Sequence, residues 1–396
     1  MSEAMQQTDH DLGRRLTALT IGMDRFERKI SKGEGALSSE GLVPIYMGEG
    51  LIEAAQLSSW QEAFEQLNAL QREAEAYQQG ARRTYLVGMI DSLRAAAELF
   101  SGKELSFSDK LERLVGAPAG AVPEEQIADM TSGLLAQLTK AGYRQGTLAE
   151  RATRWEAERA IDPSDLEPLF IGLMAEAKQR TDERIFPTGD YDMKLNLVRD
   201  IAYTARCRFD DKLMDLNADL DFTRSALKHL VAHEVFPGHS TQLLYTHARA
   251  VEGRSPADVL LCTANAATGA VQEGIGDQGI HMIDWVDSDD DAIYLNIRRL
   301  RTAAATSAAW YLMGENWPEA RVRAYLQETA FPQQAWLDGR IRFASHPFRG
   351  AFIASYWFGD EAVRTVRERT TKARFPAFVE ELYGSLNTPQ SLQMFN

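Results

Sequence analysis

The sequence predicts a mainly α-helical, multi-helix protein with a small antiparallel β-sheet next to one of its helices. The first observation is helical periodicity, because apolar residues recur at spacings of three and four from Leu57 to Tyr77. The second is a pair of capping boxes, which begin at Thr147 and Ser164 and open further helices. The third is a turn-forming cluster at 186–190, after which the helical period fades. These patterns predict a multi-helix protein whose structure changes near its middle.

Strand-like alternation occurs in places between Lys194 and Leu220, with a turn at 209–212. We expect a small antiparallel sheet there. Its last strand, at 213–219, ends shortly before the segment 230–239, and its edge could accept an extended peptide as an added strand. A structural hairpin that caps the next helix is the alternative.

Length and charge limit the domain organisation and the class of partner. The chain has 396 residues, 44% of them hydrophobic, and can bury a substantial core. We expect a helical N-terminal region at 1–185 and a metal-binding catalytic region at 186–396, packed as one unit. The net charge of −14 argues against nucleic acid or an anionic membrane as partner. The first residues lack a signal-peptide pattern and no stretch is long and apolar enough to span a membrane, which predicts a cytoplasmic location.

The segment that starts at His233 reads His-Glu-Val-Phe-Pro-Gly-His. Two ligands on an undistorted helix share a face at i and i+4, whereas His239 is at i+6. Pro237 forces the helix to deform, because its ring clashes with the carbonyl four residues earlier, and Gly238 can adopt the backbone angles of a tight re-entry. We therefore expect His239 to return over the face of His233. Glu234 would reach a water on the metal without being a ligand.

A second group of polar residues follows on the next predicted helix. A helix start at 255–256 predicts a helix over 257–283. Glu273, Asp277 and His281 are spaced by four and so share one stripe of that helix. The stripe either faces the metal or is a solvated face.

Two imidazoles and a carboxylate, with a further carboxylate next to the first imidazole, are typical of zinc hydrolases. Glu273 would supply the ligand carboxylate. His229, one turn before His233, leaves a second pairing open, in which two histidines bind a metal on an unbent helix.

Three segments resemble a known family. They are 216–220, 230–239 and 273–275, and they are similar to the bacterial family called domain of unknown function 885, which carries H-E-x-x-P-G-H followed by E-G. Its members are treated as zinc metallopeptidases of the thermolysin-like, gluzincin type, with a mostly helical fold similar to thermostable carboxypeptidases. The resemblance covers roughly the second half of the chain, and it departs from the family pattern at Gly276.

The resemblance implies a role for each residue of the motif. His233, His239 and Glu273 would bind Zn²⁺, and Glu234 would be the catalytic base. Asp277 matches the position where thermolysin-like enzymes keep an aspartate that accepts a hydrogen bond from a zinc histidine.

The C-terminal segment 346–359 is dense in aromatic residues with a few polar groups. In the resembled family a similar stretch lies on a helix that faces the metal. A hydrolase of this kind needs a donor for the oxyanion of the tetrahedral intermediate. Tyr356 is the first candidate, followed by His346 and Arg349. An aromatic core helix is the alternative.

The sequence thus predicts a zinc-dependent hydrolase that acts on a peptide or a small amide. Two alternatives stay open. One is a non-haem Fe(II) enzyme that uses the same two histidines and carboxylate, and the other is a degenerate peptidase fold that acts as a binding protein.

Overall fold

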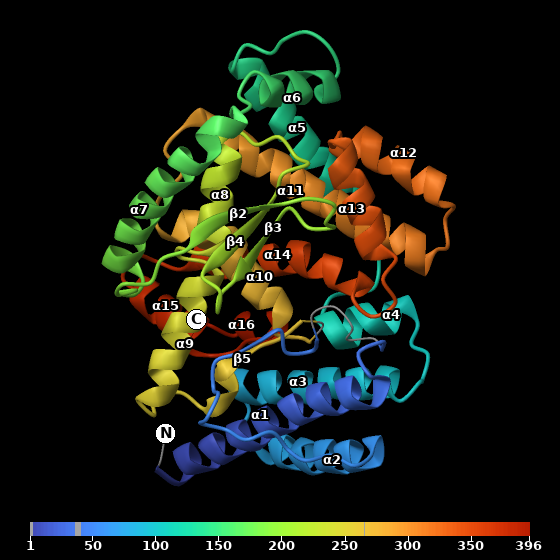
Figure 1. Cartoon of the computed structure of the whole chain (residues 1–396), viewed down its shortest axis with the longest axis vertical. Coiled ribbons are helices and arrows are strands. Elements are labelled where there is room, and N and C mark those ends of the chain that lie inside the picture. The colour runs from blue at the N-terminus through green and yellow to red at the C-terminus, as the bar shows by residue number, and fades with distance from the viewer. Residues whose placement is uncertain (1–2, 36–40, 265) are drawn as a thin grey trace. The chain divides into compact units, whose positions relative to one another are not determined.

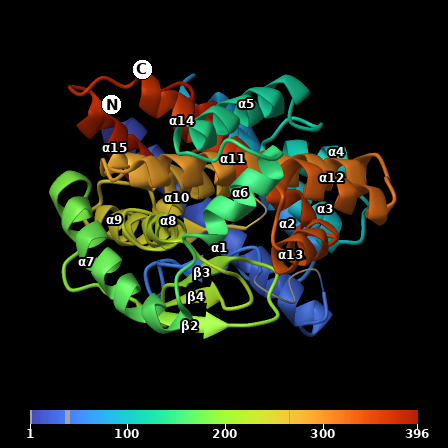
Figure 2. The same cartoon turned by 90° about the horizontal axis from the view of Figure 1, so that it is seen from above.

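The computed structural model describes residues 3–35, 41–264 and 266–396 (Figures 1 and 2). The chain forms two compact units, and each unit is built from separate segments. The first comprises Met1–Ala119, Gln242–Gly274 and Pro347–Asn396, and the second comprises Gly120–Thr241 and Ile275–His346. The boundary expected between residues 185 and 186 lies inside the second unit.

The first unit is helical, with one short strand pair. Helices α1, α2 and α3 pack against one another, and Ser59 caps α2 by accepting a hydrogen bond from the backbone of Glu62. The elements of this unit are α1 (Glu3–Ser31), β1 (Ile45–Tyr46), α2 (Trp60–Ala76), α3 (Ala81–Phe100), α4 (Phe107–Asp109), a π-helical turn (Lys110–Val115), a 3-10 turn (Ala257–Leu260), β5 (Leu261–Cys262), a second 3-10 turn (Gly350–Phe352), α14 (Ile353–Arg369), α15 (Phe375–Gly384) and α16 (Pro389–Leu392). Helices α9 (His239–Val251) and α10 (Gly269–Met282) begin in one unit and end in the other.

The helix predicted over 257–283 is wrong in its first half, because only α10 is helical there. Leu261 and Cys262 instead pair antiparallel with β1. The side chain of Gln272 donates to the carbonyl of Leu261, and the amide of Ala264 donates to the carbonyl of Leu42. These partners are distant in sequence, so the alanine-rich composition of this stretch gave no sign of them.

The second unit holds the longer sheet and the helices around it. The capping box at Thr147 is confirmed, whereas the box expected at Ser164 is replaced by Asp162, which caps a 3-10 turn that leads into α7. The elements are α5 (Glu124–Lys140), α6 (Leu148–Ala157), the 3-10 turn (Pro163–Asp165), α7 (Leu166–Arg184), β2 (Lys194–Val198), β3 (Ala205–Arg208), β4 (Leu213–Asn217), α8 (Arg224–Glu234), α11 (Asp289–Ala309), a π-helical turn (Trp310–Gly314), α12 (Glu319–Ala330) and α13 (Gln334–Ala344).

The three-stranded sheet has the order β2-β4-β3 and lies next to α8 (Figures 1 and 2). Strand β3 pairs antiparallel with β4, and β2 pairs parallel with it. Asp215 lies at the centre of β4, where it accepts hydrogen bonds from Asn196 of β2 and Arg206 of β3. The expectation that 213–219 is an edge strand is therefore wrong, because a neighbour on each side pairs with β4.

The mainly helical class with a small sheet beside α8 is confirmed. Within the described part of the chain, every helix is too short or too polar to cross a membrane.

Candidate metal centre

Helix α8 carries the first histidine of the motif and is buried on all sides. Thr223 begins the helix by accepting a hydrogen bond from the backbone of Ala226. Every residue from Ser225 to Glu234 is buried. A helix that is buried all round is expected to be apolar, so the charged and imidazole groups on α8 must find partners inside the protein.

The chain breaks between α8 and α9 at the Pro-Gly pair, as predicted. The amide of Gly238 donates to the carbonyl of Ala232, two residues before the end of α8. A Cβ atom at position 238 would lie 1.7 Å from the carbonyl oxygen of His233, so the turn accepts only glycine. Helix α9 then begins at His239. The ring centres of His233 and His239 lie 4.8 Å apart, with their planes at 87°.

Hydroxyl groups at the start of α9 hold the end of α8. Ser240 donates to the carbonyl of Glu234 at 3.0 Å, and Thr241 donates to the carbonyl of Val235 at 3.0 Å. The hydroxyl of Ser240 also lies 3.3 Å from the Sγ atom of Cys207 on β3. These contacts hold the backbone at the C-terminal end of α8, where Glu234 follows His233 in sequence.

Asp277 on α10 lies behind His233. Its Oδ1 atom is 2.6 Å from Nδ1 of His233 and also contacts the guanidinium of Arg298 on α11. Burial alone would raise the pKa of Asp277, but the charge of Arg298 and the contact with His233 hold that pKa well below its usual range. Asp277 is therefore an ionised, buried carboxylate that orients the imidazole of His233.

Gly276 allows this approach. A Cβ atom at position 276 would lie 2.7 Å from Nδ1 of His233 and within 3 Å of two further ring atoms. The residue at which the sequence departs from the resembled family pattern is thus one that lets α10 approach the imidazole of His233. Because Nδ1 of His233 faces Asp277, a metal would bind His233 through Nε2.

Glu273 precedes Asp277 by four residues on the continuous helix α10. Residues at this spacing leave a helix on the same face, one turn apart. His281, another four residues on, follows at the end of the same helix.

His229, His233 and Asp277 form a buried group, whose possible ligand atoms lie within 4.8 Å of one another. Neither ring nitrogen of His229 has a hydrogen-bond partner in the described residues. Burial lowers the pKa of His229 well below its usual value, and the charge of Arg298 lowers it further, so the ring is neutral. Arg298 already supplies the positive charge that Asp277 attracts. The charge of Arg298 opposes a metal ion at this group.

The predicted oxyanion residues belong to different units. Tyr356 lies on α14, is half-buried, and meets the ring of Phe352 edge-on at 6.0 Å. Its neighbour Trp357 is buried in the core. Arg349 precedes the 3-10 turn in the same unit, whereas His346 follows α13 in the second unit. The assignment of an oxyanion donor stays a prediction.

Sequence reasoning missed two charged residues of this region, Arg298 and Lys228. A buried aspartate on an apolar helix implies a cationic partner, but no motif marks Arg298 as that partner. Lys228 did carry a signal, since it interrupts an apolar run that leads into the motif.

Comparisons with known proteins find solved structures of similar fold, but they identify no family. No model of a protein family matches the chain, and no curated protein matches it. A solved structure described as "the putative lipoprotein from Colwellia psychrerythraea" is similar with a TM-score of 0.59 and 14% identity, over 85% of this chain and 68% of that one. A second, described as "a putative lipoprotein of unknown function from Shewanella oneidensis", has a TM-score of 0.51 and 16% identity, over 84% and 70%.

These findings overturn the resemblance to domain of unknown function 885. No family model supports it, and the structural neighbours are described as lipoproteins and not as metallopeptidases. At such low identity the likeness shows the fold alone. The cytoplasmic location expected from the sequence stays a prediction.

Proposed function

We propose that this protein is a zinc-dependent hydrolase of peptide or amide bonds. The observation that carries the proposal is the meeting of two imidazoles across a helix break that only glycine permits. A buried glutamate follows the first imidazole in sequence, and a buried aspartate contacts that imidazole. The proposal rests on these residues and their contacts, and not on any family.

His233 through Nε2, His239 and Glu273 would hold the metal. The donor set fits zinc, because neutral imidazoles and one carboxylate are its usual ligands in catalytic sites. Asp277 fits as well, since a zinc histidine usually donates its other ring N–H to a carboxylate. A bound zinc ion would polarise the substrate carbonyl and lower the pKa of a bound water toward neutrality.

Glu234 would act as the general base. It follows His233 in sequence and is held at the end of α8 by Ser240, so it can take a proton from the attacking water and pass it to the leaving amine. Tyr356 would donate a hydrogen bond to the oxyanion, with His346 and Arg349 as the other candidates.

Metal analysis of the purified protein, combined with a Glu234→Gln variant, tests the proposal. We expect one equivalent of zinc in both proteins and loss of amide hydrolysis only in Glu234→Gln. Iron in place of zinc would favour an Fe(II) enzyme, and protein without metal would favour a binding protein. Hydrolysis retained by Glu234→Gln would remove the glutamate from its role.

Two histidine variants decide which imidazoles bind the metal. We expect His239→Ala to lose zinc and His229→Ala to keep it, because Arg298 opposes a cation beside His229. The reverse result in metal analysis would establish the pair on α8 as the ligands and would contradict the proposed site.

A further inference from the structure

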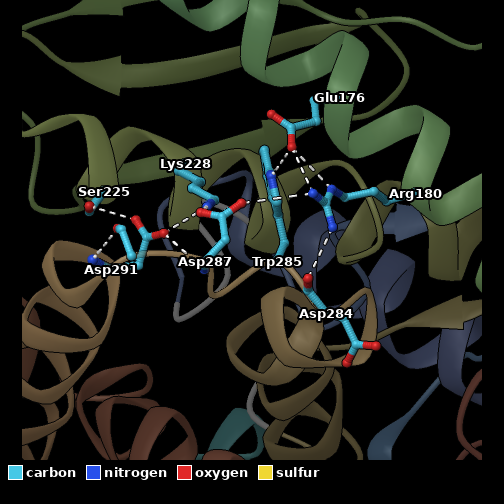
Figure 3. Close-up of polar contacts among 9 residues, drawn as sticks. Glu176, Arg180, Ser225, Lys228, Asp284, Trp285, Asp287 and Asp291 are labelled. Carbon is cyan, nitrogen blue, oxygen red and sulfur yellow. Dashed lines mark hydrogen bonds and ion pairs between the residues drawn. The ribbon is translucent and has the colours of Figure 1, made fainter.

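Lys228 carries a positive charge that the proposed chemistry does not use. Its side chain has 0% exposure, yet it lies one residue before His229 on α8. The ammonium lies 2.7 Å from Asp287 and 2.7 Å from Asp291, and 4.8 Å from the centre of the Trp285 ring (Figure 3). A buried cation is tolerated only when it is paired in this way.

The partners of Lys228 are themselves held in place. Asp291 accepts a second hydrogen bond from Ser225 on α8. The indole N–H of Trp285 donates to Glu176 on α7 at 2.7 Å, and Arg180 connects Glu176 to the carbonyl of Asp284 (Figure 3). The connection between α10 and α11 is therefore bound to both α7 and α8.

Among the described residues, polar contacts join α8 to α11 in two places. At the first, Lys228 and Ser225 bond to Asp291. The second runs from His233 through Asp277 to Arg298. Measured from Lys228 and Asp291, the two places lie five residues apart on α8, or about 7.5 Å, and seven apart on α11, or about 10.5 Å. Because the two contacts are separated along both helices, they fix the register of α8 along α11 more firmly than one contact would.

We propose that Lys228 is a positioning residue of the metal centre. Its bonds to Asp287 and Asp291 set the register of α8 against α11. This register brings Nδ1 of His233 into contact with the carboxylate of Asp277. The inference rests on the proposed metal site and adds a determinant of its geometry. Direct contact with substrate is excluded, because the ammonium is fully buried and bonded to two carboxylates.

Lys228→Met tests the role, because methionine keeps the unbranched side chain and removes the charge. The readouts are zinc affinity by competition with a chelator and the visible spectrum of the Co²⁺-loaded protein, which reports ligand geometry. We expect zinc to bind at least about 10-fold more weakly, the lower bound for residues that support metal ligands, and the cobalt bands to shift. Circular dichroism checks that the variant is folded.

Arg82→Met is a matched control in the first unit. Arg82 bonds to two carboxylates, Asp9 and Asp258, and its guanidinium lies 5.0 Å from the centre of the Tyr85 ring. Its loss should lower stability and leave zinc affinity and the cobalt spectrum unchanged. If both variants shift the spectrum alike, the effect is general destabilisation and the inference fails.

Asp287→Asn decides the matter if Lys228→Met does not fold. The Asp287 side chain is 51% exposed, so its replacement leaves the core intact while weakening one bond to Lys228. We expect a smaller shift of the cobalt bands in the same direction, and an unchanged spectrum would overturn the inference. Wild-type protein that binds neither ion would overturn the proposed function, whereas wild type that binds both and a folded Lys228→Met that matches it would overturn this inference alone.

Discussion

At the scale of single residues, the candidate centre depends on how the buried negative charge of Asp277 is compensated. Asp277 is buried, but the Arg298 guanidinium and the His233 imidazole keep it ionised. Burial lowers the pKa of His229 well below its usual value, and the same guanidinium lowers it further. Because Asp277 already pairs with Arg298, it fits the proposed role of orienting His233 better than that of binding a metal ion.

Asp277→Asn should weaken zinc retention by about 10- to 100-fold, because an amide is a poorer acceptor for the His233 N–H and leaves Arg298 without its carboxylate. Chelator competition followed by metal analysis measures the effect. Asp219→Asn, which removes an exposed carboxylate paired with Arg199, is the control and should retain zinc. Equal retention in all three proteins would mean that Asp277 does not support a ligand.

The acid dependence of stability should reveal the bond between Lys228 and Asp291. Burial raises the pKa of Asp291, but hydrogen bonds from Lys228 and Ser225 lower it from 3.8 to about 2. A lowered pKa stabilises the fold above the unfolded value, and this contribution is lost as the pH falls from 3.8 toward about 2. Asp287 is the other carboxylate that faces the same ammonium.

In Lys228→Met the ionised Asp291 should destabilise the fold, whereas in the wild type it stabilises the fold. Without the ammonium, burial holds the pKa of Asp291 above its unfolded value, so the ionised carboxylate destabilises the fold at neutral pH. The stability difference between wild type and variant should therefore shrink as the pH falls from neutral to about 4, close to the unfolded value for an aspartate. Urea unfolding across this range measures it. A difference independent of pH would show that Asp291 does not depend on Lys228.

At the scale of elements, sequence reasoning succeeded where the cause is local. Pro237 and Gly238 dictate the break between α8 and α9 through clashes within one turn of the chain, and His239 lies where that break required. Sequence reasoning failed where residues distant in the sequence determine the local structure. The pairing of β5 with β1 replaced the first half of a predicted helix, and β4 took the centre of its sheet because both neighbours pair with it.

Gly238→Ala should disrupt the metal centre. The added Cβ would collide with the carbonyl of His233 at 1.7 Å, and backbone atoms cannot rotate away as a side chain can. We expect loss of zinc binding and a decrease in unfolding free energy of about 1–3 kcal/mol or more, as for overpacked sites. Gly172→Ala on α7, where nothing lies within 4 Å, is the control and should be neutral or stabilising. Zinc binding retained by Gly238→Ala would contradict the role of the turn.

At the scale of the whole molecule, the division of the chain was beyond sequence reasoning. A boundary between 185 and 186 assumes that each region is one continuous stretch, whereas each compact unit gathers separate segments. Two of the crossings fall inside helices α9 and α10, where helical periodicity continues and no linker composition marks the change. Turn clusters and capping boxes locate the ends of elements, but not which elements pack together.

Metal binding should stabilise the entire fold. The proposed ligands come from α8, α9 and α10, which are separated in sequence, so an unfolded chain cannot present them together and zinc binds the native state alone. Free zinc at 100 times its dissociation constant would add about 2.7 kcal/mol to the unfolding free energy. Thermal unfolding with added zinc and with a chelator measures the shift. We expect the midpoint of wild type to rise with zinc and that of His239→Ala to stay constant, because the variant lacks a ligand. A midpoint that zinc shifts equally in both proteins would mean that the ion binds elsewhere.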